Sequence, residues 1–287
     1  MARDSVFDLY KKKNNLEKDV KRITKLLYSP CAHIDVMDSF NFLQIASNGF
    51  NDWKCRGRSL DLSDFLETIS FEGIKILATN NRDYFLLFVE VVYNIVLLAQ
   101  RTLTKRYYSV DIEAFKLILN YMDEVLSEMN QKAYYDPETE QCLIGEDSPQ
   151  VTAAVEVIAP DVASQIMRYN HRELAGDISK KKSVLQNLAG YLEGREYELK
   201  SINKQLFVDI NSAFNNLDIR HNNVAPRDSS DYKEKLAKMS PEELEKWYDD
   251  VYQLILLAIL EMDNVKRKNR IRELIQELNS KEKTEDA

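Results

Sequence analysis

The sequence predicts an all-α helical bundle with one small β-hairpin near residues 133–145, and three observations support this fold class. Glycine and proline are scarce, at 7 and 6 of 287 residues, and so few chain breakers favour long helices over many short strands. Apolar residues recur at helical spacings through most of the chain. Residues 133–145 interrupt this periodicity, with tyrosine and isoleucine on either side of an Asp-Pro turn.

The first part of the chain is expected to form five helices. Their predicted ranges are 4–29, 36–45, 62–77, 82–103 and 109–129. The fourth is apolar nearly all round, which predicts a helix surrounded by others. Glu90 and Asn94 interrupt its apolar run, so we expect a buried central helix and no membrane span. Ser109 is the expected N-cap of the fifth.

The second part is expected to be a separate helical unit. Residues 1–145 would form an N-terminal unit that ends in the hairpin, residues 146–279 a C-terminal unit, and residues 280–287 a charged tail. Helices are predicted at 149–158, 160–174, 178–214 and 241–272. Ser148, Asp177 and Ser240 are the expected N-caps, the last within a Ser-Pro-Glu-Glu capping box. No coiled-coil heptad repeat is apparent.

Composition limits the classes of function. A net charge of −8 and a pI near 5.2 argue against broad, non-specific nucleic-acid binding, although a local basic site remains compatible with them. The three cysteines are widely spaced and form no CxxC motif, which indicates a reducing, cytoplasmic compartment without disulfides or a zinc cluster. Motifs for dinucleotides, nucleotide phosphates and metalloproteases are missing, so we expect no cofactor and no metal.

The densest set of polar donors is the run Asn215–Asn223, at the predicted end of the 178–214 helix. Arg220 is permanently charged and can fork onto phosphate oxygens, while His221 can carry a proton near neutral pH. Cleavage of RNA to a cyclic phosphate needs those two roles and no metal. Asn222 and Asn223 would help to bind the substrate. The alternative is a helix end whose side chains satisfy its own carbonyl groups.

This arrangement resembles the HEPN domain over about residues 177–265: a long helix, an Arg–polar motif, a loop and a capped amphipathic helix. The resemblance implies a metal-independent ribonuclease of bacterial abortive infection or antiviral defence, acting as a homodimer. Arg220 matches the motif arginine and His221 the polar residue after it. The second motif histidine is expected near Ala225 or Pro226 and is missing. Either His221 has taken the catalytic role, or the site is degenerate.

Two further sets of residues are candidates for the same site. Arg168, Asn170 and His171 form a cluster that would face Arg220 and bind substrate, or would be a surface stripe with a histidine that caps the C-terminal end of the helix. If the intervening helix is straight, the two clusters lie about 60 Å apart, so a bend or a dimer would be needed to unite them. Asp249 would hold Arg220 or His221 in place, or would lie on a solvated face.

These features together predict a HEPN-like, RNA-binding cytoplasmic protein, with metal-independent cleavage by Arg220 and His221. Its expected partners are RNA, a second copy of the chain and a protein partner such as an antitoxin, with no membrane. The competing hypothesis is a non-enzymatic helical protein-interaction module, in which the asparagine-rich segment is structural.

Overall fold

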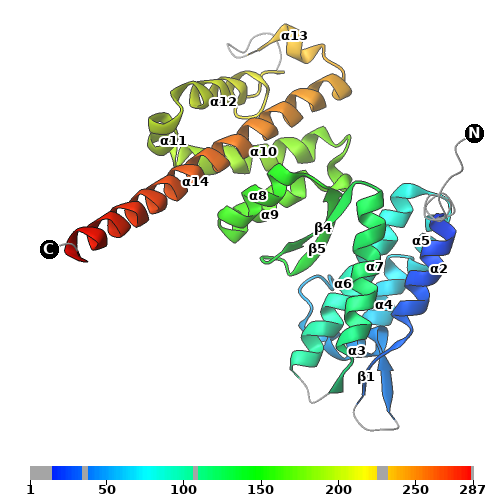
Figure 1. Ribbon diagram of the computed structural model, residues 1–287. Coiled ribbons are helices and arrows are strands. Elements are labelled where there is room, and N and C mark those ends of the chain that lie inside the picture. The colour runs from blue at the N-terminus through cyan, green and yellow to red at the C-terminus, as the bar shows by residue number, and fades with distance from the viewer. Residues whose placement is uncertain (1–14, 34–37, 106–108, 225–231, 286–287) are drawn as a thin grey trace, which may run out of the picture. The chain divides into compact units, whose positions relative to one another are not determined.

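The computed structural model describes residues 15–33, 38–105, 109–224 and 232–285. It divides the chain after Asp147 into two compact units, unit 1 (residues 1–147) and unit 2 (residues 148–287), whereas the sequence placed the boundary after Gly145. Helices make up most of each unit and two small antiparallel sheets complete unit 1 (Figure 1). The predicted predominantly helical fold with a small hairpin is therefore confirmed.

Unit 1 is built around one central helix. Its helices are α2 (Leu16–Leu27), α3 (Phe42–Gly49), the 3-10 helix η1 (Phe50–Asp52), α4 (Leu62–Thr68), α5 (Phe71–Ala78), α6 (Arg82–Thr104) and α7 (Ile112–Glu128). Helix α6 packs against α3 and α5, and Phe85, Phe88 and Val92 are fully buried. Within the described ranges, α6 is also the one helix long and apolar enough to cross a membrane. In unit 1 it is the core helix that the sequence predicted.

Two small sheets flank these helices. The predicted hairpin is present as β4 (Gln131–Asp136) paired with β5 (Gln141–Glu146). A second sheet, in the order β2-β1-β3, was not predicted. Its strands are β1 (Pro30–His33), β2 (Ser39–Asn41) and β3 (Ser109–Val110). Strands this short hold too few residues for a period-2 alternation to stand out from a helical pattern.

Several helix boundaries in unit 1 differ from the prediction. The expected helix 62–77 is divided between α4 and α5, because Ser70 adopts a left-handed conformation with φ 55°. Ser109 belongs to β3, and the N-cap of α7 is Asp111, whose carboxylate accepts the Ala114 N–H at 3.1 Å. The predicted start of the first helix near Asp4 lies outside the described residues.

Unit 2 is entirely helical in the residues described. It contains α8 (Pro149–Val157), α9 (Pro160–Tyr169), the 3-10 helix η2 (Arg172–Leu174), α10 (Ile178–Glu193), α11 (Glu196–Ile202), α12 (Lys204–Asn216), α13 (Glu234–Ala237) and α14 (Pro241–Glu285). The three predicted N-caps are confirmed. Ser148 accepts the Val151 N–H, Asp177 accepts the Lys180 N–H, and Ser240 forms a reciprocal capping box with Glu243.

The single long helix predicted over residues 178–214 is wrong. The chain ends α10 at Glu193, with Gly194 as C-cap, and breaks again at Asn203. The Asn203 side chain accepts the Leu206 N–H at 3.0 Å and so starts α12 as a new helix. The apolar stripe continues across both breaks, which is why its periodicity concealed them.

Helix α14 is longer than predicted. The basic stretch from Lys266 to Arg272 was expected to end it, but the helix continues to Glu285 and so includes part of the predicted tail. One face of its first half packs against α8, α10, α11 and α12. Its second half, from about Asn264, extends past the other helices of unit 2 (Figure 1), and every side chain from 266 to 278 is exposed.

Candidate functional site

The Asn215–Asn223 run folds into a tight cap that follows α12. Asp218 adopts a left-handed conformation with φ 60°, which turns the chain away from the helix. The Asp218 N–H donates to Oδ1 of Asn223 at 2.8 Å, and the Asn223 N–H donates to Oδ1 of Asp218 at 2.9 Å. Both residues are buried. Asn223 was expected to bind substrate, but it holds this cap together, since buried polar groups must be paired.

The cap lies beside the first half of α10. Nζ of Lys182 is 2.7 Å from Oδ2 of Asp218, and Nε2 of Gln186 donates to the carbonyl of Ile219 at 2.7 Å. The breaks at Gly194 and Asn203 reverse the chain, so that residue 218 returns to the level of residue 182. A straight helix would instead have carried residue 218 about 60 Å away from its start.

Arg220 is held by three side chains and one ring. Nη1 donates to Oδ1 of Asn211 at 3.0 Å and to Oδ1 of Asn215 at 3.1 Å. Nη2 lies 2.5 Å from Oε1 of Glu193, and the guanidinium carbon lies 5.3 Å from the centre of the Phe214 ring. These contacts fix the plane of the guanidinium, which is the requirement for a directed, two-pronged contact with an anion.

This guanidinium lines a hollow of about 260 Å³ between α10, α11 and α12. The walls are both apolar and acidic. They are formed by Leu192, Glu193, Glu196, Leu199, Phe207, Ile210, Asn211, Phe214 and Arg220. Lys200 forms an ion pair with Glu196, and Arg220 with Glu193, so both wall carboxylates are matched by cations. The Arg220 side chain is 26% exposed, which leaves it reachable from this side.

His221 and Asn222 follow Arg220 and are exposed. Neither side chain makes a hydrogen bond or ion pair with another described residue, so both remain accessible to a ligand. Of the four consecutive candidates, the structure therefore leaves His221 and Asn222 open, holds Arg220 at the edge of a pocket, and uses Asn223 internally.

The second cluster predicted from sequence is mainly structural. Arg168 is exposed near the end of α9, and Asn170 is the C-cap of that helix. His171 is 8% exposed, and its Nδ1 accepts the Glu173 N–H at 3.3 Å, which caps η2. His171 thus caps the start of η2, because a short helix leaves its first N–H groups in need of acceptors. The alternative predicted from sequence was a histidine that caps the C-terminal end of a helix on a surface stripe, and His171 is instead a buried N-cap.

Asp249 does not contact Arg220 or His221, so the expected supporting role is wrong. Its Oδ1 accepts from the Tyr169 hydroxyl at 2.9 Å and from Nζ of Lys181 at 2.6 Å. Burial, together with the charge of Asp249, raises the pKa of Tyr169 well above its ordinary value. Asp249 thus joins α14 to α9 and α10, because the face of α14 that carries it turns toward Lys181.

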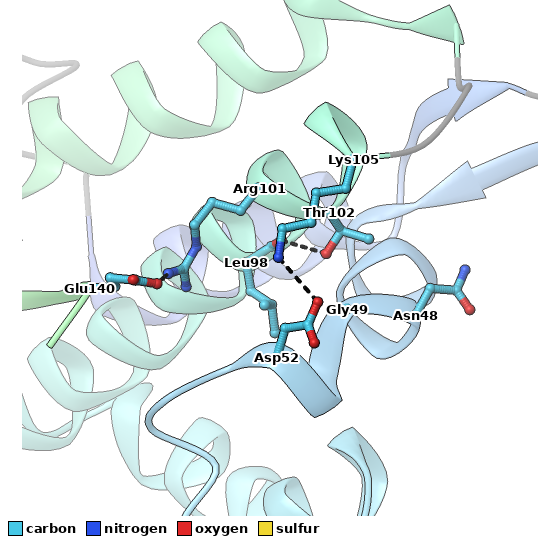
Figure 2. Close-up of a pocket in the computed structure, with 8 residues that line it drawn as sticks. All are labelled: Asn48, Gly49, Asp52, Leu98, Arg101, Thr102, Lys105 and Glu140. Atoms are coloured by element: carbon cyan, nitrogen blue, oxygen red, sulfur yellow. Dashed lines mark hydrogen bonds and ion pairs between the residues drawn. The ribbon is translucent and has the colours of Figure 1, made fainter.

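A second polar pocket, in unit 1, was missed by sequence reasoning (Figure 2). Its volume is about 140 Å³, and it is lined by Asn48, Gly49, Asp52, Leu98, Arg101, Thr102, Lys105 and Glu140. Arg101 donates to the Glu140 carboxylate, and Nζ of Lys105 lies 3.1 Å from Oδ2 of Asp52. The sequence offered one hint, an arginine near the end of a largely apolar helix.

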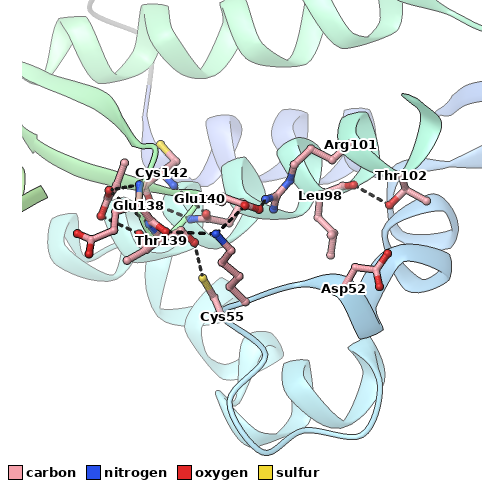
Figure 3. A network of polar contacts seen from close by, with 12 residues as sticks. Asp52, Cys55, Leu98, Arg101, Thr102, Glu138, Thr139, Glu140 and Cys142 are labelled. Carbon is pink, nitrogen blue, oxygen red and sulfur yellow. Dashed lines mark hydrogen bonds and ion pairs between the residues drawn. The ribbon is translucent and has the colours of Figure 1, made fainter. Parts of the chain in front are cut away.

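The wider network joins the hairpin turn to α6 (Figure 3). Nζ of Lys54 lies 2.8 Å from Oε1 of Glu140, and the Cys55 thiol donates to the Thr139 carbonyl at 3.3 Å. The hydrogen bond from Lys54 lowers the pKa of Glu140, which keeps this carboxylate ionised between two cations. Because Glu140 and Asp52 are each paired with a cation, the network mainly ties the hairpin turn and the end of η1 to α6.

No group of three or more histidine, cysteine or acidic side chains is placed to hold a metal ion within the residues described. Comparison with models of protein families, with curated proteins and with solved structures finds no match. The fold defines a two-unit helical protein, and the hollow beside Arg220 in unit 2 is its best candidate site.

Proposed function

We propose that this chain is an RNA-binding protein of the HEPN-like type, and that it contacts RNA phosphate through Arg220. One observation carries the proposal. The Arg220 guanidinium is held in a fixed plane at the edge of a hollow, and the carboxylate of Glu193 lies where a phosphate oxygen would bind, 2.5 Å from Nη2. A carboxylate and a phosphate make the same kind of charged, two-pronged contact with arginine.

Phosphate would displace Glu193 at low cost. The Glu193 side chain is 55% exposed, and an exposed ion pair contributes about 0–1 kcal/mol. Asn211 and Asn215 would remain bonded to Nη1 and keep the guanidinium oriented. The proposed site is thus pre-organised for an anion, with Glu193 acting as an internal competitor.

His221 supplies the second role, because its exposed imidazole follows Arg220 directly. In the proposed reaction His221 takes the proton from a 2′-hydroxyl, and the 2′-oxygen attacks the adjacent phosphorus. The bond from phosphorus to the 5′-oxygen then breaks, and the 5′-oxygen takes a proton back from the imidazolium of His221. Arg220 stabilises the negative charge of the phosphorane. No metal takes part. Abortive infection or antiviral defence in a bacterium is the setting that the HEPN resemblance implies for this activity.

The experiment measures binding and cleavage separately. The full chain is titrated into fluorescent single-stranded RNA at low salt, and labelled total RNA is incubated with the protein in EDTA. Arg220→Ala should weaken binding by about tenfold or more, while His221→Ala should abolish cleavage and leave binding nearly unchanged. Arg195→Ala is the matched control, since Arg195 pairs with Glu198 at 3.0 Å and does not line the hollow.

The outcomes separate the two steps of the proposal. Equal binding by the wild type, Arg220→Ala and Arg195→Ala would reject Arg220 as the phosphate contact. Binding that depends on Arg220 without cleavage in EDTA would retain the RNA-binding function and reject the ribonuclease step.

A non-enzymatic interaction module is the second candidate. It is favoured by the internal use of three predicted site residues, His171, Asn223 and Asp249, in caps and ion pairs. A chain that binds no RNA at low salt would support this candidate over the first.

A further inference from the structure

The exposed second half of α14 carries an apolar stripe. Ile271, Leu274, Ile275 and Leu278 are between 50% and 58% exposed, and their spacing places them on one side of the helix. Side chains of this size, gathered on one face, mark a surface that another molecule covers. No described residue of the same chain covers it.

The stripe is part of a heptad pattern that becomes visible once exposure is known. Steps of three and four residues connect Leu257, Leu260, Asn264, Arg267, Ile271, Leu274 and Leu278. These are the a and d positions of a coiled coil. Asn264 and Arg267 interrupt the apolar run, and they concealed the repeat in the sequence. Leu257 and Leu260 line a hollow of about 360 Å³ that continues the same face onto the body of unit 2.

Positive and negative side chains are separated along this segment, with a cationic stretch followed by an acidic one. Residues 266–272 contain five cationic side chains and no acidic one, namely Lys266, Arg267, Lys268, Arg270 and Arg272. Residues 273–287 contain five acidic side chains and two lysines. Two such helices side by side in parallel would place cation against cation, whereas an antiparallel pair places the cationic part of each against the acidic part of the other.

We propose that α14 forms an antiparallel coiled coil with α14 of a second copy of this chain. The heptad register places Ile271 against the partner subunit's Leu274, and Arg267 against the partner subunit's Leu278. Arg270 then lies beside the partner subunit's Glu277, and the two-fold axis repeats this ion pair. A parallel pair would instead oppose Arg267 to its own copy, which costs repulsion at a core position.

The same features argue against other occupants of the stripe. An anionic membrane surface would attract the cationic part and repel Glu273 and Glu277, which lie beside the apolar residues. An RNA strand would use the cations and leave four large apolar side chains in water. A second copy satisfies the apolar stripe and both charged parts at once.

Sedimentation equilibrium of the full chain tests the pairing. The expected mass is twice the 33.4 kDa of one chain. Leu274→Glu should raise the dimer dissociation constant by at least about tenfold, since it puts a charge at a core position. Gln276→Glu makes the same change in charge on the opposite face of the helix and should leave the constant unchanged. Circular dichroism should be equal for all three, because these side chains are exposed in the monomer.

Charge exchange tests the orientation. Arg270→Glu and Glu277→Arg should each weaken the dimer, and the double variant should restore it, since the pair is rebuilt only in the antiparallel register. A monomeric wild type, or a dimer indifferent to Leu274→Glu, would overturn the proposal. If the double variant dimerises no better than the single variants, the antiparallel register is rejected. The mass readout is independent of RNA binding.

Discussion

Oε1 of Glu193 lies 2.5 Å from Nη2 of Arg220, and this contact joins the end of α10 to the cap that follows α12. The two residues are separated by α11 and α12 in sequence, and the chain reversal brings them together. The same arginine is bonded to Asn211 and Asn215. In the proposed site Glu193 competes with phosphate for the Arg220 guanidinium, so substitution of Glu193 tests the proposal most directly.

Glu193→Gln should strengthen RNA binding. The amide removes the negative charge that competes with phosphate, while Asn211 and Asn215 still orient Arg220. We expect a gain of a few-fold, in line with an exposed ion pair worth about 0–1 kcal/mol. Fluorescence anisotropy with labelled RNA at two salt concentrations measures it. Glu198→Gln, which breaks the Arg195 pair instead, should have a smaller effect, and a larger one would contradict the role given to Glu193.

Asn223→Ala should destabilise unit 2. The substitution removes the acceptor of the Asp218 N–H and leaves a buried donor unpaired, which costs about 1–3 kcal/mol. Urea denaturation followed by circular dichroism measures the free energy of unfolding. Asn222→Ala is the matched control, because Asn222 is exposed and should cost less than about 0.5 kcal/mol. Equal stability of the two variants would contradict the capping role.

Glu140→Ala should destabilise unit 1, because it leaves the partly buried Arg101 without its carboxylate. Nε and Nη2 of Arg101 are already buried without a partner among the described residues. Loss of the Glu140 carboxylate would therefore leave the whole guanidinium poorly paired. We expect about 1–3 kcal/mol, measured by thermal and urea denaturation. Glu138→Ala, two residues earlier and exposed, should have little effect. A similar loss in both variants would point to the turn backbone and away from the ion pair.

Cys31 predicts a pH dependence of stability. Burial in β1, with the nearby charge of Asp111 as a smaller cause, raises the pKa of Cys31 to about 12, against about 8.5 for an ordinary thiol. Between these values the unfolded chain has lost a proton that the folded chain keeps. The stabilisation is therefore complete below about pH 8.5 and is lost as the pH rises toward 12.

Comparison with Cys31→Ala isolates this contribution. Over the interval from about pH 9 to pH 11, the unfolding free energy of the wild type should fall more steeply than that of the variant. The difference in slope should approach about 1.4 kcal/mol per pH unit. Urea denaturation at several pH values measures both slopes, and parallel slopes would mean that the Cys31 thiol titrates normally in the folded chain.

Local features of the fold were predictable from sequence. Ser148, Asp177 and Ser240 were assigned as N-caps and are observed as such, because a cap depends on a side chain and an N–H only a few residues apart. The division of residues 178–214 into three helices was missed. A left-handed residue or a cap such as Asn203 can interrupt a helix while the apolar stripe on either side remains in phase.

The candidate site was predictable as a set of residue types and not as a set of contacts. Arginine, histidine and asparagine at a helix end indicated phosphate binding, whether or not the helix bent. The partners of Arg220 come from α10 and α12, and sequence spacing did not indicate that these helices fold back. For Asp249 the prediction failed because its helix face turns toward Lys181 and Tyr169.

The sequence by itself determined the helical class, the hairpin and the N-caps at Ser148, Asp177 and Ser240, since these depend on propensity and contacts within one turn. Tertiary structure decided which polar residues remain available. It buried Asn223 and His171 in caps, left His221 exposed, and placed Arg220 against Glu193. It also left the stripe of α14 uncovered. Burial depends on which helix faces meet in three dimensions. Chain reversals decide this, because they bring together residues that lie far apart in the sequence.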